Sequence, residues 1–305
     1  MPTKRLYFLD NLKWFIIWLM TVFHAAMCYM AYAPEWWYVV DTAQPVFSAT
    51  VFILWVDIFI MPVMFFISGY FGLMSLTKHG AGTFWRKKIG RIAVPWVFGS
   101  MVFAPLVTYI ILASRHAPVD FWTFYTTLFW GPLYEQAQYW YLGALLALYV
   151  LLTIAVAVAP SLWRQSMTPK RPSVPLYVAL IVLSTASIYA TGSVMHPDTW
   201  TFYAYILVLQ PVRIVTYILV FFLGAFFQRQ LDYTTPLLTN LSATSYPVYY
   251  LHMEVLFPVA WLFTTLPALN VYLKYIVVCA LTLGICYVFS KYILLRIPCF
   301  GGTRK

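Results

Sequence analysis

The chain has few charged residues: Asp, Glu, Lys and Arg make up only 9% of its 305 residues. An ordinary soluble domain carries roughly a quarter, so this composition excludes one. Hydrophobic residues make up 63% and occur in runs along the whole length, and no segment between the runs is long enough to form an anchored soluble domain. We therefore expect an integral membrane protein.

Cysteine is also scarce, with four residues in the chain. Three of them fall within apolar runs and Cys299 follows the last run, which predicts neither a disulfide framework nor a metal-binding motif. The sequence lacks a repeat of fixed period and low-complexity tracts, and its one polar linker is Trp163–Ser173. We expect a single membrane-embedded domain over residues 1–305, without a bound metal.

Apolar runs of about 20 residues, long enough to cross a bilayer as a helix, recur about eight times. The segment Phe121–Pro132 is too short to cross, so we expect it at the interface or dipping in from one side, which leaves room for up to ten spans. The runs do not alternate with a period of two, which disfavours a β-barrel and favours an all-α bundle. The predicted spans are Leu12–Tyr32, Val46–Ser75, Ile92–Ala113, Tyr139–Ala159, Pro175–Gly192, Phe202–Phe227, Ala243–Thr265 and Val271–Leu294.

The net charge of +10 would suggest a nucleic-acid partner in a soluble protein, but the positions of the basic residues indicate a membrane topology instead. With the first span starting inside, all but three of the 19 Lys and Arg residues fall on one side. The exceptions are Arg115 and Lys274 on the other side and Arg213 within a span. The opposite loops are acidic and include Asp41. The positive-inside rule then predicts that both termini lie in the cytoplasm, with membrane lipid as a partner and no nucleic acid.

Five ionisable residues lie near the middle of predicted spans: His24, Asp57, Arg213, His252 and Glu254. A charged group at a helix centre costs about 2.5–3.5 kcal/mol on insertion scales, so such groups usually face a shared, partly wet cavity. This predicts a functional site formed by spans one, two, six and seven. The alternative is a set of structural pairs, such as Arg213 with Asp57 or Glu254, that hold the bundle together.

Lys13 precedes His24 by eleven residues, which places both on one helix face about 20° apart and about 16 Å apart along the axis. A cation at the cytoplasmic mouth can hold phosphate, while an imidazole deeper in the membrane can accept a proton. This pair suits a long anionic ligand. The alternative for His24 is a structural hydrogen bond.

A basic cluster, Arg86-Lys87-Lys88-Ile89-Gly90-Arg91, is expected in a cytoplasmic loop just before the third span. Four cations beside a helix start favour a site for phosphates or anionic lipid headgroups. The alternative is a loop whose charge only sets the topology.

Six motifs are spread along the chain. They are Tyr7-Phe8-Leu9-Asp10-Asn11-Leu12-Lys13-Trp14 through Phe23-His24, Phe65-Phe66-Ile67-Ser68-Gly69-Tyr70-Phe71, Lys88-Ile89-Gly90-Arg91 with Pro95, Tyr139-Trp140-Tyr141-Leu142, Phe222-Leu223-Gly224 and Ser245-Tyr246-Pro247-Val248-Tyr249-Tyr250-Leu251-His252. In this order they resemble the motifs of the acyltransferase 3 family of bacterial integral membrane acyltransferases. The similarity covers nearly the whole chain, although Lys88 stands where the family's Arg-x-x-Arg motif commonly begins with Arg.

The resemblance implies transfer of an acyl group, most often acetyl, from cytoplasmic acetyl-coenzyme A or another acyl-coenzyme A. The acceptor would be a hydroxyl of an extracytoplasmic glycan, glycolipid or small molecule, and the location the bacterial inner membrane. The family's histidine corresponds to His24 and its first basic position to Lys13. We expect coenzyme A phosphates at Arg86, Lys88 and Arg91, with Lys13 as a further contact.

The expected mechanism uses His24 as the general base on the acceptor hydroxyl, or as an acylated intermediate. Glu254 or Asp57 would orient the imidazole. Two other classes remain open: a secondary transporter with a proton relay through the buried ionisable residues, and a catalytically inactive member that only binds a partner. The residues expected to bind acceptor, or the developing oxyanion, are Arg213, Ser68 and His252.

Overall fold

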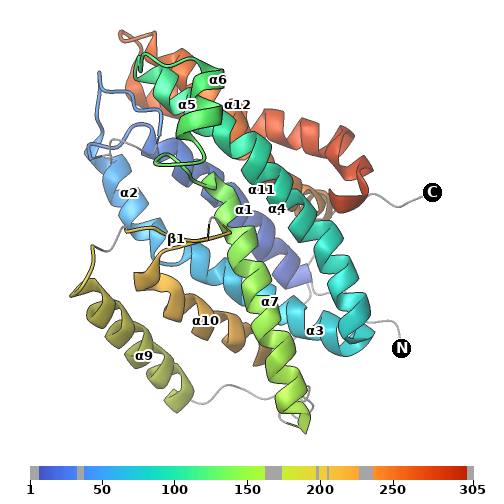
Figure 1. Cartoon of the computed structure of the whole chain (residues 1–305). Coiled ribbons are helices and arrows are strands. Elements are labelled where there is room, and N and C mark those ends of the chain that lie inside the picture. The colour runs from blue at the N-terminus through green and yellow to red at the C-terminus, as the bar shows by residue number, and fades with distance from the viewer. Residues whose placement is uncertain are drawn as a thin grey trace. The chain divides into compact units, whose positions relative to one another are not determined.

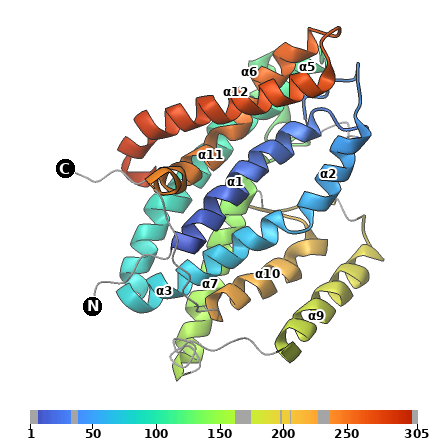
Figure 2. The same ribbon diagram turned by 180° about the vertical axis from the view of Figure 1, so that it is seen from behind.

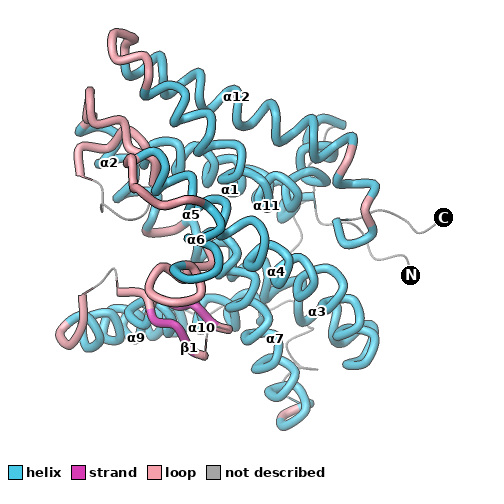
Figure 3. The backbone as a smooth tube through the Cα atoms, turned by 45° about the horizontal axis from the view of Figure 1, so that its top comes forward, coloured by secondary structure: helices cyan, strands magenta, loops and turns pink. Residues whose placement is uncertain are grey.

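The computed structural model describes residues 7–32, 38–161, 174–196, 199–204, 206–226 and 236–300. Across these residues the chain is helical apart from loops and one short hairpin (Figure 3), which confirms the predicted all-α membrane class. Four of the described helical segments are long and apolar enough to cross a membrane. They are Phe47–Ser114, Ala137–Val158, Val174–Gly192 and Val271–Arg296. The count of eight crossings and the cytoplasmic termini stay predictions.

The chain divides into two compact units, each assembled from three stretches of sequence. The first unit comprises Met1–Leu9, Ile60–Val94 and Trp140–Tyr233, and the second comprises Asp10–Phe59, Pro95–Tyr139 and Thr234–Lys305. The described elements mainly within the first unit are α3 (Ile60–Lys88), η1 (Ile89–Ala93), α7 (Trp140–Val158), α9 (Val174–Gly192), β1 (Thr201–Tyr203), β2 (Leu207–Leu209) and α10 (Pro211–Phe226). Those mainly within the second are α1 (Tyr7–Met27), α2 (Phe47–Asp57), α4 (Val94–Phe98), η2 (Gly99–Phe103), α5 (Ala104–Ser114), α6 (Phe121–Thr123), η3 (Phe124–Leu128), η4 (Ala137–Tyr139), α11 (Pro236–Thr264), α12 (Val271–Tyr292), η5 (Leu294–Arg296) and η6 (Pro298–Phe300).

The first unit is built on the crossing of α3 and α10, with α9 alongside α10 (Figure 1). Two glycines meet at the crossing: a Cβ on Gly69 would lie 1.9 Å from the Phe221 carbonyl oxygen, and one on Gly224 would lie 2.0 Å from the Phe66 carbonyl oxygen. Small residues let membrane helices approach this closely, so that their backbones touch. The two glycines therefore explain why both sequence motifs contain this residue.

The predicted span Phe202–Phe227 is only partly helical. Strands β1 and β2 pair as an antiparallel hairpin, with Phe202 opposite Val208, and α10 starts at Pro211. Proline is favoured in the first turn of a helix because its missing N–H needs no partner there. Arg213 is therefore the third residue of α10, and the prediction that it sits at the middle of a helix is wrong.

The segment from α3 to α5 is helical where a loop was predicted. Gly80, with a φ of 72°, kinks α3, but the helix continues through Lys88 into the π-helical turns η1 and η2. These turns precede Pro95 and Pro105, which cannot donate the hydrogen bond that an α-helix requires. A π-type bulge accommodates such a residue without ending the helix. The short predicted segment Phe121–Pro132 forms α6 and η3, too short to cross.

In the second unit α11 and α12 run side by side (Figure 2), and α11 contains Pro247 and Pro258. The loop after α1 is attached to α12 by a fully buried ion pair, in which the Lys274 ammonium lies 2.5 Å from the Asp41 carboxylate. Both residues were predicted on the same, acidic side of the membrane, and their contact agrees with that assignment.

Candidate functional site

Helix α1 carries both Lys13 and His24 without a break, as the spacing predicted. The eleven intervening steps correspond to about 16 Å along the axis. Ala25 and Ala26 next to the histidine are fully buried, whereas His24 itself is partly exposed. His24 is thus held in the packed part of α1 and is less completely buried than the two residues that follow it.

His24 pairs with a second histidine from α11. Its Nδ1 lies 2.9 Å from Nε2 of His252, and the two rings are tilted by 34° with centroids 4.9 Å apart. His252 is fully buried, and its Nδ1 lies 2.6 Å from the carbonyl oxygen of Tyr249 one turn earlier. Two of the five predicted mid-span residues therefore meet, although they lie 228 positions apart in sequence.

Glu254 belongs to a different polar group on α11. Residues two positions apart on a helix point about 200° apart, so Glu254 faces away from His252. Its carboxylate accepts hydrogen bonds from Gln138 Nε2 at 2.7 and 2.9 Å, and Tyr139 Oη lies 2.7 Å from Glu254 Oε1. The same amide and hydroxyl also lie 3.2 and 2.9 Å from the Tyr250 carbonyl oxygen. The partner of His24 is accordingly His252, and the carboxylate is held by η4.

Sequence reasoning missed Gln138. The signal available was two glutamines, Gln136 and Gln138, directly before an apolar span. Both are buried, and Gln136 Oε1 accepts a hydrogen bond from Trp96 Nε1 at 3.1 Å.

Asp57, the other predicted acid, is the last residue of α2, where the chain turns toward α3. Among the described residues, no group of three or more His, Cys, Asp or Glu side chains could hold a metal ion.

The remaining candidates lie in the first unit. Ser68 Oγ is 2.7 Å from Tyr141 Oη, and the Tyr149 hydroxyl donates to the Ser68 carbonyl at 3.3 Å. Arg213 is half-buried at the start of α10, and its backbone N–H donates to the Gln210 carbonyl at 3.1 Å. These contacts place Ser68 in a tyrosine network between α3 and α7.

The basic cluster lies on a helix, and the prediction of a loop there is wrong. Arg86 and Lys87 at the end of α3 are exposed, as is Arg91 in η1. Lys88 instead turns inward: its Nζ lies 4.1 Å from the centre of the Tyr149 ring and 5.2 Å from that of Phe84. Such cation–π contacts hold an ammonium in place without neutralising it. The cluster thus presents three exposed cations around one that is fixed.

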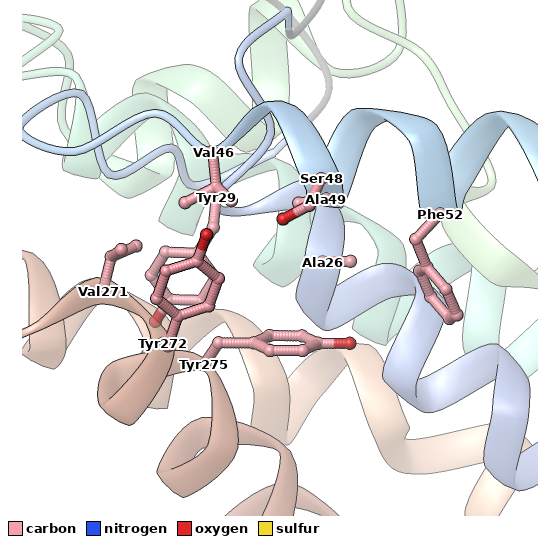
Figure 4. A pocket seen from close by; sticks show the side chains of 9 residues that line it. All are labelled: Ala26, Tyr29, Val46, Ser48, Ala49, Phe52, Val271, Tyr272 and Tyr275. Atoms are coloured by element: carbon pink, nitrogen blue, oxygen red, sulfur yellow. The ribbon is translucent and has the colours of Figure 1, made fainter.

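An apolar pocket of about 300 Å³ lies in the second unit between α1, α2 and α12 (Figure 4). Tyr29, Tyr272 and Tyr275 gather at one end and Phe52 lies at the other. On α1 the lining residue Ala26 is about 200° around the helix from His24, and Tyr29 lies in the turn that follows α1. The pocket is therefore behind the histidine pair and is not part of it.

Over residues 6–235 the chain matches the family model described as an acyltransferase domain. It is also similar to glucans biosynthesis protein C from Salmonella paratyphi B, Salmonella dublin and Salmonella enteritidis PT4, with 27% identity over 192 residues in each case. These alignments cover 60% of this chain and 46% of each relative, so the matched part spans less than half the length of those relatives. No solved structure matches the chain.

Proposed function

The chain belongs to the acyltransferase 3 family, and from this premise we propose that it transfers an acyl group from cytoplasmic acyl-coenzyme A to a hydroxyl on the far side of the bacterial inner membrane. We expect the group to be acetyl. The observation that carries the proposal is the 2.9 Å contact between His24 and His252, which lie near the middle of two predicted spans, because ionisable groups inside membrane helices are expensive and usually functional.

In this reaction His24 acts as the general base. It takes the proton from the acceptor hydroxyl while the hydroxyl oxygen bonds to the thioester carbon. The carbon–sulfur bond then breaks, and His24 returns the proton to the departing thiolate. The histidine ends as it began, and the products are an ester and free coenzyme A.

The basic cluster supports the donor side of the proposal. Coenzyme A carries several phosphate charges, which Arg and Lys bind by charge-assisted hydrogen bonds. Arg86 and Arg91 are exposed on the α3–η1 helix and Lys88 is held over Tyr149 between them. Lys13, about 16 Å before His24 along α1, would supply a further cation.

The relatives support a glycan as the acceptor, because they are named for glucan biosynthesis. A glucan oligosaccharide is therefore the first acceptor to test, followed by a glycolipid and a small hydroxylated molecule. A mass increase of one acyl unit on the acceptor identifies the transferred group and the acceptor together.

The catalytic assignment is tested with His24→Ala in purified, detergent-solubilised protein supplied with acetyl-coenzyme A and the glucan. Because a general base contributes about 10²–10⁴-fold, turnover should fall by at least that lower factor while coenzyme A binding stays nearly intact. The matched control is His79→Ala, which removes an exposed histidine of α3. More than about a tenth of wild-type turnover in His24→Ala would overturn the general-base role.

The donor site is tested by titrating coenzyme A calorimetrically against Arg91→Ala and Lys78→Ala. Both residues are exposed cations on the same helical segment, so the two changes remove the same charge. A charge-assisted hydrogen bond contributes about 1.5–3 kcal/mol, so Arg91→Ala should weaken binding tenfold or more. Lys78→Ala should leave affinity close to wild type. Equal small losses would mean a diffuse electrostatic surface without a specific donor site.

A further inference from the structure

The contacts around His252 assign it a role that the proposed reaction leaves open. We propose that His252 is a positioning residue, which fixes the tautomer of His24 so that His24 Nε2 is the basic nitrogen. The inference rests on the proposed function, because a basic nitrogen matters only if His24 accepts a proton. The group that orients His24 is then the neutral imidazole of His252, whereas the sequence had predicted the carboxylate of Glu254 or Asp57.

The proton positions follow from the partner of His252 Nδ1. A carbonyl oxygen can only accept, so at 2.6 Å from the Tyr249 carbonyl this nitrogen must carry a hydrogen. In a neutral imidazole the other nitrogen, Nε2, is then an acceptor. It faces His24 Nδ1 at 2.9 Å, so His24 Nδ1 must donate. This leaves the lone pair of His24 on Nε2.

The turn that carries His252 is held from the other side of α11. The Tyr249 hydroxyl donates to the backbone carbonyl of Gln138, and the Gln138 side chain donates to the Tyr250 carbonyl at 3.2 Å. The Tyr250 hydroxyl donates to the Pro95 carbonyl at 3.1 Å. The Tyr249 carbonyl that orients His252 belongs to this anchored turn. The backbone therefore determines which nitrogen donates in each hydrogen bond from His24 to His252 and from His252 to Tyr249.

Burial separates the two histidines into different roles. His252 is fully buried, so a substrate hydroxyl cannot reach it, whereas His24 is partly exposed. A base has to come within hydrogen-bonding distance of the proton it removes. His24 is therefore the base, and His252 is the support behind it.

A neutral partner suits a membrane interior. In the familiar Ser-His-Asp arrangement a buried carboxylate orients the histidine, but a charge at a helix centre costs about 2.5–3.5 kcal/mol. Two neutral imidazoles carry no charge in the resting state. When His24 Nε2 takes the hydroxyl proton, His24 Nδ1 still donates to His252, and His252 keeps its own proton throughout. The positive charge exists only until the thiolate recovers the proton.

Substitutions of His252 test the role by geometry. The side-chain oxygen of His252→Gln can reach the former Nε2 position and accept from His24 Nδ1, whereas His252→Leu keeps volume but accepts nothing. We expect His252→Leu to lower kcat by about 100-fold or more, with KM for acetyl-coenzyme A and glucan within about threefold of wild type. His252→Gln should keep at least about a tenth of kcat. The matched control is Met253→Leu, a buried neighbour on α11, which should remain as active as wild type.

A spectroscopic measurement separates positioning from packing. In protein labelled with ¹⁵N-histidine, the chain's five histidines are few enough to assign, with His24→Asn identifying the relevant signals. Wild type and Met253→Leu should show His24 protonated on Nδ1 and unprotonated on Nε2. His252→Leu should lose this single tautomer even when its unfolding temperature matches wild type.

The outcomes distinguish this inference from the function on which it rests. Loss of activity in His24→Ala together with full activity in His252→Leu would overturn the positioning role and leave the acyltransferase reaction standing. Equal losses in His252→Gln and His252→Leu, or an Nε2-protonated His24 in wild type, would also overturn it. Absence of acyl transfer by the wild-type protein with every acceptor class would overturn the proposed function itself.

Discussion

Replacing Gly69 with alanine should separate the two helices at the centre of the first unit. The added Cβ would start 1.9 Å from the Phe221 carbonyl oxygen, and Cβ atoms essentially never approach within 3.0 Å, so α3 and α10 must move apart by about 1 Å. The obstructing atom belongs to a backbone, so no rotamer change can relieve the contact. A gap of 0.5–1 Å forfeits a quarter to a half of each dispersion contact across the interface.

Gly69→Ala should therefore cost about 3 kcal/mol, the upper end of the range for overpacked sites. At roughly 2–4 °C per kcal/mol, the thermal unfolding midpoint in detergent should fall by about 6 °C or more, measured by tryptophan fluorescence. The control is Gly82→Ala on the same helix, where nothing lies within 4 Å of the added atom. It should leave stability unchanged or raise it by about 0.5–1 kcal/mol. A Gly69→Ala protein as stable as Gly82→Ala would refute the backbone contact.

Three further predictions concern charged residues. Burial raises the pKa of Glu135 from 4.5 to about 7, and a hydrogen bond from Thr108 opposes this shift. Because the folded chain holds this proton more tightly than the unfolded chain does, the free energy of unfolding should fall as the pH rises from 4.5 to 7. Glu135→Gln should remove that slope in thermal scans, and an unchanged slope would contradict it. Asp41→Ala should lower the free energy of unfolding by about 3–5 kcal/mol, because it leaves the buried Lys274 ammonium without its partner. Adding Lys274→Met should restore most of that stability. A double variant no more stable than Asp41→Ala would contradict the importance of the ion pair. Lys87→Cys should resist impermeant thiol reagents in intact cells, and labelling would reverse the assigned orientation.

The part of the site that sequence reasoning predicted depends on a single helix. Because α1 is continuous from Tyr7 to Met27, the positions of Lys13 and His24 follow from helical geometry alone. Continuous apolar runs likewise predicted the four long apolar helical segments, since a segment of that length must satisfy its backbone polar groups internally. The polar character of His252 marked it as a candidate, but its position 228 residues from His24 gave no indication that the two would touch.

Other features depend on backbone adjustments and packing that composition does not encode. Strands β1 and β2 are as apolar as the helix α10 that follows them, so a hydropathy window merges the strands with the helix. The basic cluster was expected in a loop because charge usually interrupts a span, yet the π-turn before Pro95 lets the helix continue. Glu254 and His252 were grouped by depth, although rotation around α11 points them in opposite directions.

The two prolines of α11 bracket the turn that carries His252. Pro247 leaves the Ala243 carbonyl without its helical donor, and Pro258 does the same for the Glu254 carbonyl. The helix consequently has its weakest joints five residues before and six residues after the histidine. Bending of α11 should therefore concentrate at these two joints. The turn between them then moves as one rigid segment, so that a bend at either end of α11 leaves the contact between His252 and α1 in place.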